Sequence, residues 1–107
     1  MVINFDETKR IPNFKGGDGE FIASIYSDNL GKIISGRLEP GSSIGLHTHD
    51  TSSEIIFILS GEADIIYDDE QEIVQAGKCH YCPKGHSHTM RNNGIEDLVF
   101  YAVVPEQ

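Results

Sequence analysis

Short stretches in which apolar and polar residues alternate recur along this chain, with turn-forming residues between them. Each stretch is rich in β-branched and aromatic side chains, a composition typical of β-strands. The strands that we expect on this basis span residues 20–27, 31–39, 53–61, 62–70, 71–77 and 96–104. No segment shows the helical periodicity of a crossover connection. The pattern therefore predicts an all-β fold, either a sandwich or a barrel.

Two glycine-containing segments need an interpretation of their own. The "NNG" at residues 92–94 predicts a type I′ hairpin turn, because Asn-Gly suits the left-handed backbone of that turn. The glycine-rich segment at residues 15–20 precedes an expected strand. A phosphate-binding loop would precede a helix instead, so we interpret this segment as a plain turn.

The acidic composition limits the classes of partner. The 107 residues carry a formal net charge of −9, which repels phosphate backbones and anionic lipid, so we expect neither a nucleic-acid nor a membrane partner. The longest apolar run, "IIFIL", has only the length of a strand, and no signal peptide is visible. We therefore expect a cytoplasmic protein. The 38% hydrophobic content and the length fit a single domain over residues 1–107.

A cluster of histidine and glutamate is the first candidate site. His47 and His49 are two residues apart, so on a strand both imidazoles lie on one face. Glu54 begins the next expected strand, and in an antiparallel hairpin it can lie opposite His49 on that same face. Two imidazoles and a carboxylate suit Fe²⁺, Mn²⁺, Ni²⁺ or Zn²⁺. Two solvated histidines in a turn explain this short segment equally well.

The wider sequence resembles the cupin family. The first cupin motif, G(X)5HXH(X)3–4E(X)6G, is filled by Gly41, His47, His49, Glu54 and Gly61. The second motif, G(X)5PXG(X)2H(X)3N, is filled by Gly77, Pro83, Gly85, His88 and Asn92. Both motifs are complete and in order. The chain is thus similar to small single-domain cupins.

This resemblance implies a fold and a ligand set. The fold is the double-stranded β-helix, the cupin or jelly-roll barrel. The implied ligands of one divalent transition-metal ion per chain are His47, His49, Glu54 and His88. Three imidazoles and one carboxylate leave coordination positions open for water, substrate or dioxygen. The resemblance also implies a homodimer, for which an N-terminal strand at residues 2–5 is a candidate contact.

Two functional hypotheses follow from the resemblance. The first is a metal-dependent enzyme, resembling a dioxygenase, isomerase or decarboxylase, that acts on a small polar or anionic molecule. The alternative is a non-catalytic module that binds or senses a small ligand such as a sugar or an organic acid. An enzyme should have a titratable or hydrogen-bonding group near the metal besides the ligands, whereas a binding module needs only apolar walls.

The "CHYC" segment is interpreted as a strand. Cys79 and Cys82 then face opposite sides of the sheet, which argues against a disulfide or a shared zinc ion. A redox CxxC motif normally opens a helix, and none is expected here. Cys82 is our candidate for a wall of the pocket.

Other side chains are assigned by their place along the expected strands. Ile56 and Ile58 share the face of Glu54, so we expect them inside the barrel. His86 falls in a turn, and we expect it outside the ligand set; His80 is expected to be packed or solvated. Arg37 is expected in solvent, since charged side chains are seldom buried.

Overall fold

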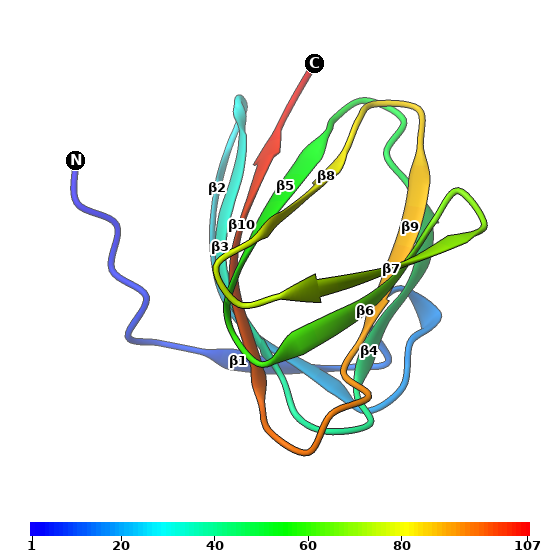
Figure 1. Ribbon diagram of the computed structural model, residues 1–107. Coiled ribbons are helices and arrows are strands. Elements are labelled where there is room, and N and C mark those ends of the chain that lie inside the picture. The colour runs from blue at the N-terminus through cyan, green and yellow to red at the C-terminus, as the bar shows by residue number, and fades with distance from the viewer.

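The computed structural model describes residues 1–107 and contains two antiparallel β-sheets that enclose one core (Figure 1). The six-stranded sheet has the order β1-β2-β3-β10-β5-β8, and the four-stranded sheet has the order β4-β9-β6-β7. The elements are β1 (Lys9–Pro12), η1 (Phe14–Gly16), β2 (Glu20–Asp28), β3 (Gly31–Leu38), β4 (Ser43–Thr48), β5 (Glu54–Ser60), β6 (Glu62–Tyr67), β7 (Glu70–Gln75), β8 (Cys79–Cys82), β9 (Ser87–Arg91) and β10 (Leu98–Pro105). The all-β jelly-roll prediction is confirmed. No helix is long and apolar enough to cross a membrane.

The core is built from the inward-facing positions of both sheets. Ile56 and Ile58 are 2% and 1% exposed, so their predicted place inside the barrel is confirmed. Phe100 lies between β3 and β5, and its ring stacks on Phe21 with centroids 5.9 Å apart. A side chain at Gly36 would put a Cβ atom 2.5 Å from the Phe100 ring. The absence of a side chain there is what lets this aromatic pair pack.

A β-bulge in β4 turns the histidines toward the interior. Ile44 pairs with Met90 and His47 pairs with His88, so β4 has one more residue than β9 between these pairs. Ile44 and His47 are three residues apart and would face opposite sides of a regular strand. The extra residue restores a common inward face for both, while Leu46 within the bulge is largely exposed. The bulge therefore turns His47, a candidate ligand, toward the interior.

The type I′ turn occurs at a different place from the one predicted. Asp68 and Asp69 connect β6 to β7, and both have positive φ, 46° and 71°, as a two-residue type I′ turn requires. The prediction of such a turn at residues 92–94 is wrong, because β9 and β10 belong to different sheets and form no hairpin. Asn92 is instead buried and donates hydrogen bonds to the carbonyl groups of Leu38 and Glu96.

The N-terminus does not form the strand expected at residues 2–5. The first strand is β1, which pairs with β2, and the residues before it form a coil beside the six-stranded sheet (Figure 1). Within that segment, the ring of Phe5 stacks on Tyr101 of β10, with centroids 5.9 Å apart. Residues 2–5 form no strand in the single chain. The contact of this segment in a homodimer stays a prediction.

Candidate metal centre

Four side chains from both sheets meet at one end of the barrel. His47 is the penultimate residue of β4, His49 follows that strand, Glu54 begins β5 and His88 lies in β9. This end also carries the β2–β3 turn, the β8–β9 loop and the C-terminus, at the top of Figure 1. One potential ligand atom from each of the four side chains lies within 4.8 Å of the others. The structure thus brings together all four residues that the sequence singled out, and this group could hold a metal ion.

Glu54 reaches the cluster by a different route from the one expected. We expected a hairpin in which Glu54 pairs beside His49, but β4 and β5 lie in different sheets. The loop between them crosses from the four-stranded to the six-stranded sheet, so Glu54 faces His49 across the barrel interior. The hairpin geometry is wrong, although the predicted proximity of the two side chains is confirmed by a 3.2 Å contact between His49 Nε2 and Glu54 Oε1.

The spacing of the donor atoms suits a transition-metal ion. His88 Nε2 lies 2.9 Å from Glu54 Oε1, 3.0 Å from His49 Nε2 and 3.1 Å from His47 Nε2. The widest separation involving the carboxylate is 4.0 Å, from His47 Nε2 to Glu54 Oε1. Two donors at right angles around an ion, with bonds of about 2.1 Å, lie about 3.0 Å apart. The donor set therefore fits one divalent ion.

The Nδ1 atoms of the three imidazoles have partners that orient the rings. His47 Nδ1 lies 2.8 Å from the carbonyl oxygen of Gly45, which can only accept, so the neutral ring carries its proton on Nδ1. His49 Nδ1 lies 3.1 Å from Ser52 Oγ. The lone pair of His47 Nε2 is thereby directed at the cluster. Such partners are the usual means of fixing a metal-binding histidine.

The electrostatic environment favours the protonation states that a metal needs. Burial lowers the pKa of His47 and outweighs the opposing hydrogen bond to Gly45, so the imidazole is neutral at physiological pH. Burial alone would raise the pKa of Glu54, but in the metal-free protein the adjacent imidazoles of His49 and His88 hold it at about 2. Neutral imidazoles and an ionised carboxylate are the forms that bind divalent ions.

A cavity of about 480 Å³ opens beside three of the four side chains, His47, His49 and Glu54. Lys15 of η1 and Lys32 of β3 bring positive charge to its wall, whereas the adjoining loop contributes Asp50. Its complete lining is Phe14, Lys15, Ser27, Asp28, Gly31, Lys32, Ile34, His47, Thr48, His49, Asp50, Thr51, Ser52, Glu54, Val104 and Glu106. The cavity is predominantly polar, and its walls come from segments far apart in sequence.

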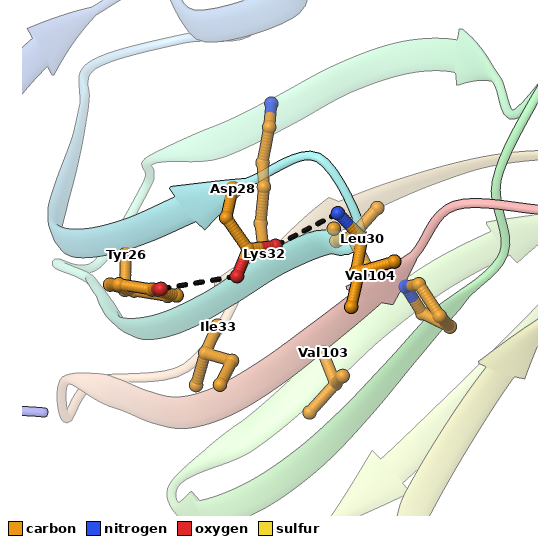
Figure 2. Close-up of a pocket in the computed structure, with 9 residues that line it drawn as sticks. Tyr26, Asp28, Leu30, Lys32, Ile33, Val103 and Val104 are labelled. Atoms are coloured by element: carbon orange, nitrogen blue, oxygen red, sulfur yellow. Dashed lines mark hydrogen bonds between the residues drawn. The ribbon is translucent and has the colours of Figure 1, made fainter. Parts of the chain in front are cut away.

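The β2–β3 turn that forms one wall is held by Asp28. Its carboxylate accepts hydrogen bonds from Tyr26 Oη at 3.1 Å and from the Leu30 backbone N–H at 2.8 Å (Figure 2). A neighbouring pocket of about 210 Å³ is lined by these same residues together with Ile33 and Val103. The turn therefore separates the metal-site cavity from a smaller, mainly apolar hollow.

The two cysteines do not take part in the site. Both are free, with Cys79 exposed and Cys82 buried, which confirms their predicted opposite faces. Cys82 pairs with Glu54 across β5 and β8, and burial raises the pKa of its thiol to about 12. It is absent from the lining of the cavity. The prediction that Cys82 forms a pocket wall is therefore wrong, because its thiol lies in the packed interior.

His86 and Arg37 lie outside the cluster, as expected. His86 lies in the β8–β9 loop, and its side chain is hydrogen-bonded to those of Asp68 and Tyr67 at the end of β6. Arg37 is 42% exposed and forms a 3.1 Å ion pair with Asp97. Neither side chain lines the metal-site cavity.

His80 is the residue whose role the sequence did not show. It is 3% exposed, and its Nε2 lies 3.0 Å from His88 Nδ1. Its other ring nitrogen, Nδ1, lies 3.0 Å from Glu72 Oε1. One signal pointed toward this position: His80 alternates with Cys82 along "CHYC", so an inward-facing Cys82 places His80 inside the barrel as well.

Comparison with known proteins adds independent findings. Residues 35–104 match the family model described as the cupin domain. The chain is 36% identical over 113 residues to the oxalate-binding protein of Thermotoga maritima, across 97% of this chain and 93% of that protein. It is 33% identical to the crystal structure of a predicted oxalate decarboxylase from Thermotoga maritima, with a TM-score of 0.92 and full coverage of both chains. A cupin barrel protein from Salinispora arenicola shares the fold, with a TM-score of 0.77, 22% identity, and coverage of 97% and 87%.

Proposed function

The chain belongs to the cupin family, and we propose that it binds one divalent transition-metal ion and, on that ion, a small organic acid of the oxalate type. The proposed ligands are His47, His49, Glu54 and His88. The observation that carries the proposal is the convergence of four oriented donor atoms beside a cavity that contains two lysines. When bound, the ion would supply Lewis-acid positions for carboxylate oxygens of the acid.

Charge supports an anionic ligand despite the acidic composition. Three neutral imidazoles and one carboxylate neutralise only one of the two charges of a divalent ion, so the loaded site is a net cation. Lys15 and Lys32 at the cavity wall add to the attraction of an anion. Asp28, Asp50 and Glu106 of the same lining oppose it, so the bound ion would supply the main attraction. The names of the Thermotoga maritima relatives point to oxalate. A cavity of about 480 Å³ also has room for larger organic acids.

The test is whether oxalate binding depends on the metal. Protein stripped with a chelator and reloaded with Mn²⁺ should release heat when titrated with oxalate, while the stripped protein should not. Lys32→Gln should weaken binding, and Lys78→Gln, which removes the same charge at an exposed residue outside the cavity lining, should not. Equal oxalate binding with and without metal, or none with metal, would contradict the proposal.

A second candidate function is catalysis at the same site. Asp50 and Glu106 line the cavity in addition to the metal ligands, and a titratable group near the metal is the feature expected of an enzyme. The related predicted oxalate decarboxylase makes release of CO₂ from oxalate the reaction to examine first. CO₂ and formate produced by metal-loaded protein would establish catalysis. If oxalate is recovered intact after saturation binding, the protein binds oxalate without converting it.

We also propose that a second copy of the chain covers the outer face of the six-stranded sheet. This face carries Phe57, Leu59, Tyr81 and Tyr101, each 45–53% exposed. Phe57 and Tyr101 are paired across β5 and β10, so the exposed apolar surface is continuous. The resemblance to single-domain cupins, which commonly pair sheets, supports a second copy as the occupant of this face.

Light scattering at several concentrations tests the homodimer. The wild type should have twice the mass of one 11.8 kDa chain, and Phe57→Asp should be monomeric. The matched control is Ile73→Asp, which changes an equally exposed side chain on the other sheet and should leave the dimer intact. A monomeric wild type contradicts this proposal. A cytoplasmic location, a single domain over residues 1–107 and the exclusion of nucleic-acid and membrane partners stay predictions from composition.

A further inference from the structure

A buried hydrogen-bond chain leads from one proposed metal ligand to the protein surface. His80 Nε2 lies 3.0 Å from His88 Nδ1, and His80 Nδ1 lies 3.0 Å from Glu72 Oε1. We propose that Glu72 and His80 are positioning residues, which hold His88 in the tautomer and ring orientation that bind the metal ion. We refer to this chain of Glu72, His80 and His88 as the relay. The inference rests on the proposed metal site.

The chemistry of each atom fixes the direction of the relay. His88 Nε2 must be unprotonated to bind an ion, so the neutral ring carries its proton on Nδ1 and can only donate there. His80 Nε2 must then accept, which places the proton of His80 on its Nδ1. That proton is donated to Glu72, whose carboxylate can only accept. The carboxylate at the far end therefore selects the metal-binding tautomer of His88.

His88 is the ligand for which such control matters most. Its Nε2 lies within 3.1 Å of a donor atom from each of the other three ligands, Glu54, His49 and His47. A rotation of the His88 ring would change all three spacings together. The other two histidines are oriented by nearby groups of the β4 segment and its loop, a backbone carbonyl and a serine hydroxyl. Only the ring orientation of His88 depends on residues from two other strands.

Burial prevents water from replacing His80. The side chains of His80 and His88 are 2% and 3% exposed, whereas Glu72 is 42% exposed. Loss of the imidazole would leave the buried His88 Nδ1–H without an acceptor, and nothing would then oppose the alternative tautomer. The rings of Tyr67 and His80 form a T-shaped pair, with centroids 5.6 Å apart, which restricts rotation of the His80 ring.

The relay also connects the edge strands of the two sheets, β8 and β7, across what we call the seam of the barrel. β8 is the edge strand of the six-stranded sheet, and β7 is the edge strand of the four-stranded sheet. A purely structural role for Glu72 and His80, fastening these two edges, is thus the competing explanation. Such a role would affect the stability of the metal-free protein but not the intrinsic affinity of the folded protein for metal. Metal affinity and the histidine tautomer are therefore the informative measurements.

The first experiment measures the Kd for Zn²⁺ of chelator-stripped protein by competition with a chelating dye. His80→Leu should weaken Zn²⁺ binding by about 10- to 100-fold, as is typical for loss of a partner that orients a metal-binding histidine. His80→Gln should recover part of the loss, because its amide oxygen can accept the proton of His88 Nδ1. Glu72→Gln should weaken binding less than His80→Leu, because an amide at that position can accept or donate.

The matched control is Glu70→Gln. Glu70 lies two residues from Glu72 on β7, carries the same charge and is exposed, so its removal should leave the Kd unchanged. Circular dichroism in the presence of chelator shows whether each variant is folded. If His80→Leu does not fold, Glu72→Gln carries the test, since its site is partly exposed.

The second measurement reads the tautomer directly. In a ¹⁵N NMR spectrum of Zn²⁺-loaded protein, both His80 and His88 should be protonated at Nδ1 and unprotonated at Nε2. In Glu72→Gln, His80 should show the alternative tautomer in part. A proton on His80 Nε2 in the wild type, or wild-type Kd values in both His80→Leu and Glu72→Gln, would overturn the relay alone. A wild type that binds no Zn²⁺ would overturn the metal site and the relay together.

Discussion

Replacement of Asn92 by alanine should destabilise the protein without affecting the metal site. The side chain is 1% exposed and makes three hydrogen bonds. Its Nδ2 donates to the carbonyl oxygens of Leu38 and Glu96, each at 2.8 Å, and its Oδ1 accepts from the Gly94 N–H at 2.9 Å. Each such bond contributes about 1 kcal/mol, so Asn92→Ala should lose about 3 kcal/mol.

Thermal unfolding in the presence of a chelator measures this loss, because a bound ion would otherwise add its own stabilisation. For a domain of this size, about 3 kcal/mol corresponds to a decrease in Tm of roughly 12 °C. Asn92→Asp should be at least as damaging, because the carboxylate keeps the bond from Gly94 but cannot donate to the two carbonyl groups.

Ile95→Ala is the control for Asn92→Ala. Ile95 lies in the same connection and is 95% exposed, so its replacement should change the free energy of unfolding by no more than about 0.5 kcal/mol. The β9–β10 connection lies at the opposite end of the barrel from the metal site (Figure 1), so folded Asn92→Ala should bind metal with wild-type affinity. A loss below about 1 kcal/mol for Asn92→Ala would refute the hydrogen-bond account.

Two further predictions concern the thiols and the β6–β7 turn. A thiol reagent at pH 8 should modify Cys79 alone in the native protein and both cysteines after denaturation, because Cys82 is buried with its pKa raised to about 12. The unfolded thiol has a pKa of 9.0, so the stability contributed by buried Cys82 is complete below pH 9 and is lost as pH rises toward 12. Cys82→Ala should remove this decrease in the free energy of unfolding between pH 9 and pH 12. An unchanged decrease in that variant would contradict the prediction. Asp69→Gly should raise stability by about 0.5 kcal/mol, because φ at Asp69 is 71° and glycine relieves the left-handed backbone. Asp68→Gly should instead destabilise the protein, since Asp68 accepts a hydrogen bond from the Ser87 N–H at 3.0 Å. If Tm changes in the same direction in both variants, this difference between the two turn residues is contradicted.

Local sequence patterns were sufficient for the all-β architecture but not for its connections. Alternation identified the strands because one face of each sheet is buried, as at Ile56 and Ile58. The hairpin turn predicted from "NNG" is absent because the chain passes from one sheet to the other there, and burial of Asn92 outweighs the local turn preference. The bulge in β4 could not be predicted from local sequence either, because it is defined by pairing with β9, more than thirty residues away along the chain.

The candidate site was predictable only as far as the motifs extend. The two cupin motifs placed His47, His49, Glu54 and His88 together, and the structure brings them together. The relay was missed because Glu72 and His80 act across the seam between two edge strands, where no backbone pairing links them. The cavity lining was likewise not predictable, since it combines η1, the β2–β3 turn and the C-terminal residues.

Metal titration of chelator-stripped protein tests the central claim most directly. Mn²⁺, Fe²⁺, Ni²⁺ and Zn²⁺ should be titrated in turn, and at least one should bind with one equivalent per chain. At a free concentration of 100 times Kd, the bound ion should stabilise the fold by about 2.7 kcal/mol. His47→Ala and His88→Ala should abolish both the binding and the stabilisation. Failure of every ion to bind at micromolar concentrations, or unchanged binding by the two variants, would contradict the account.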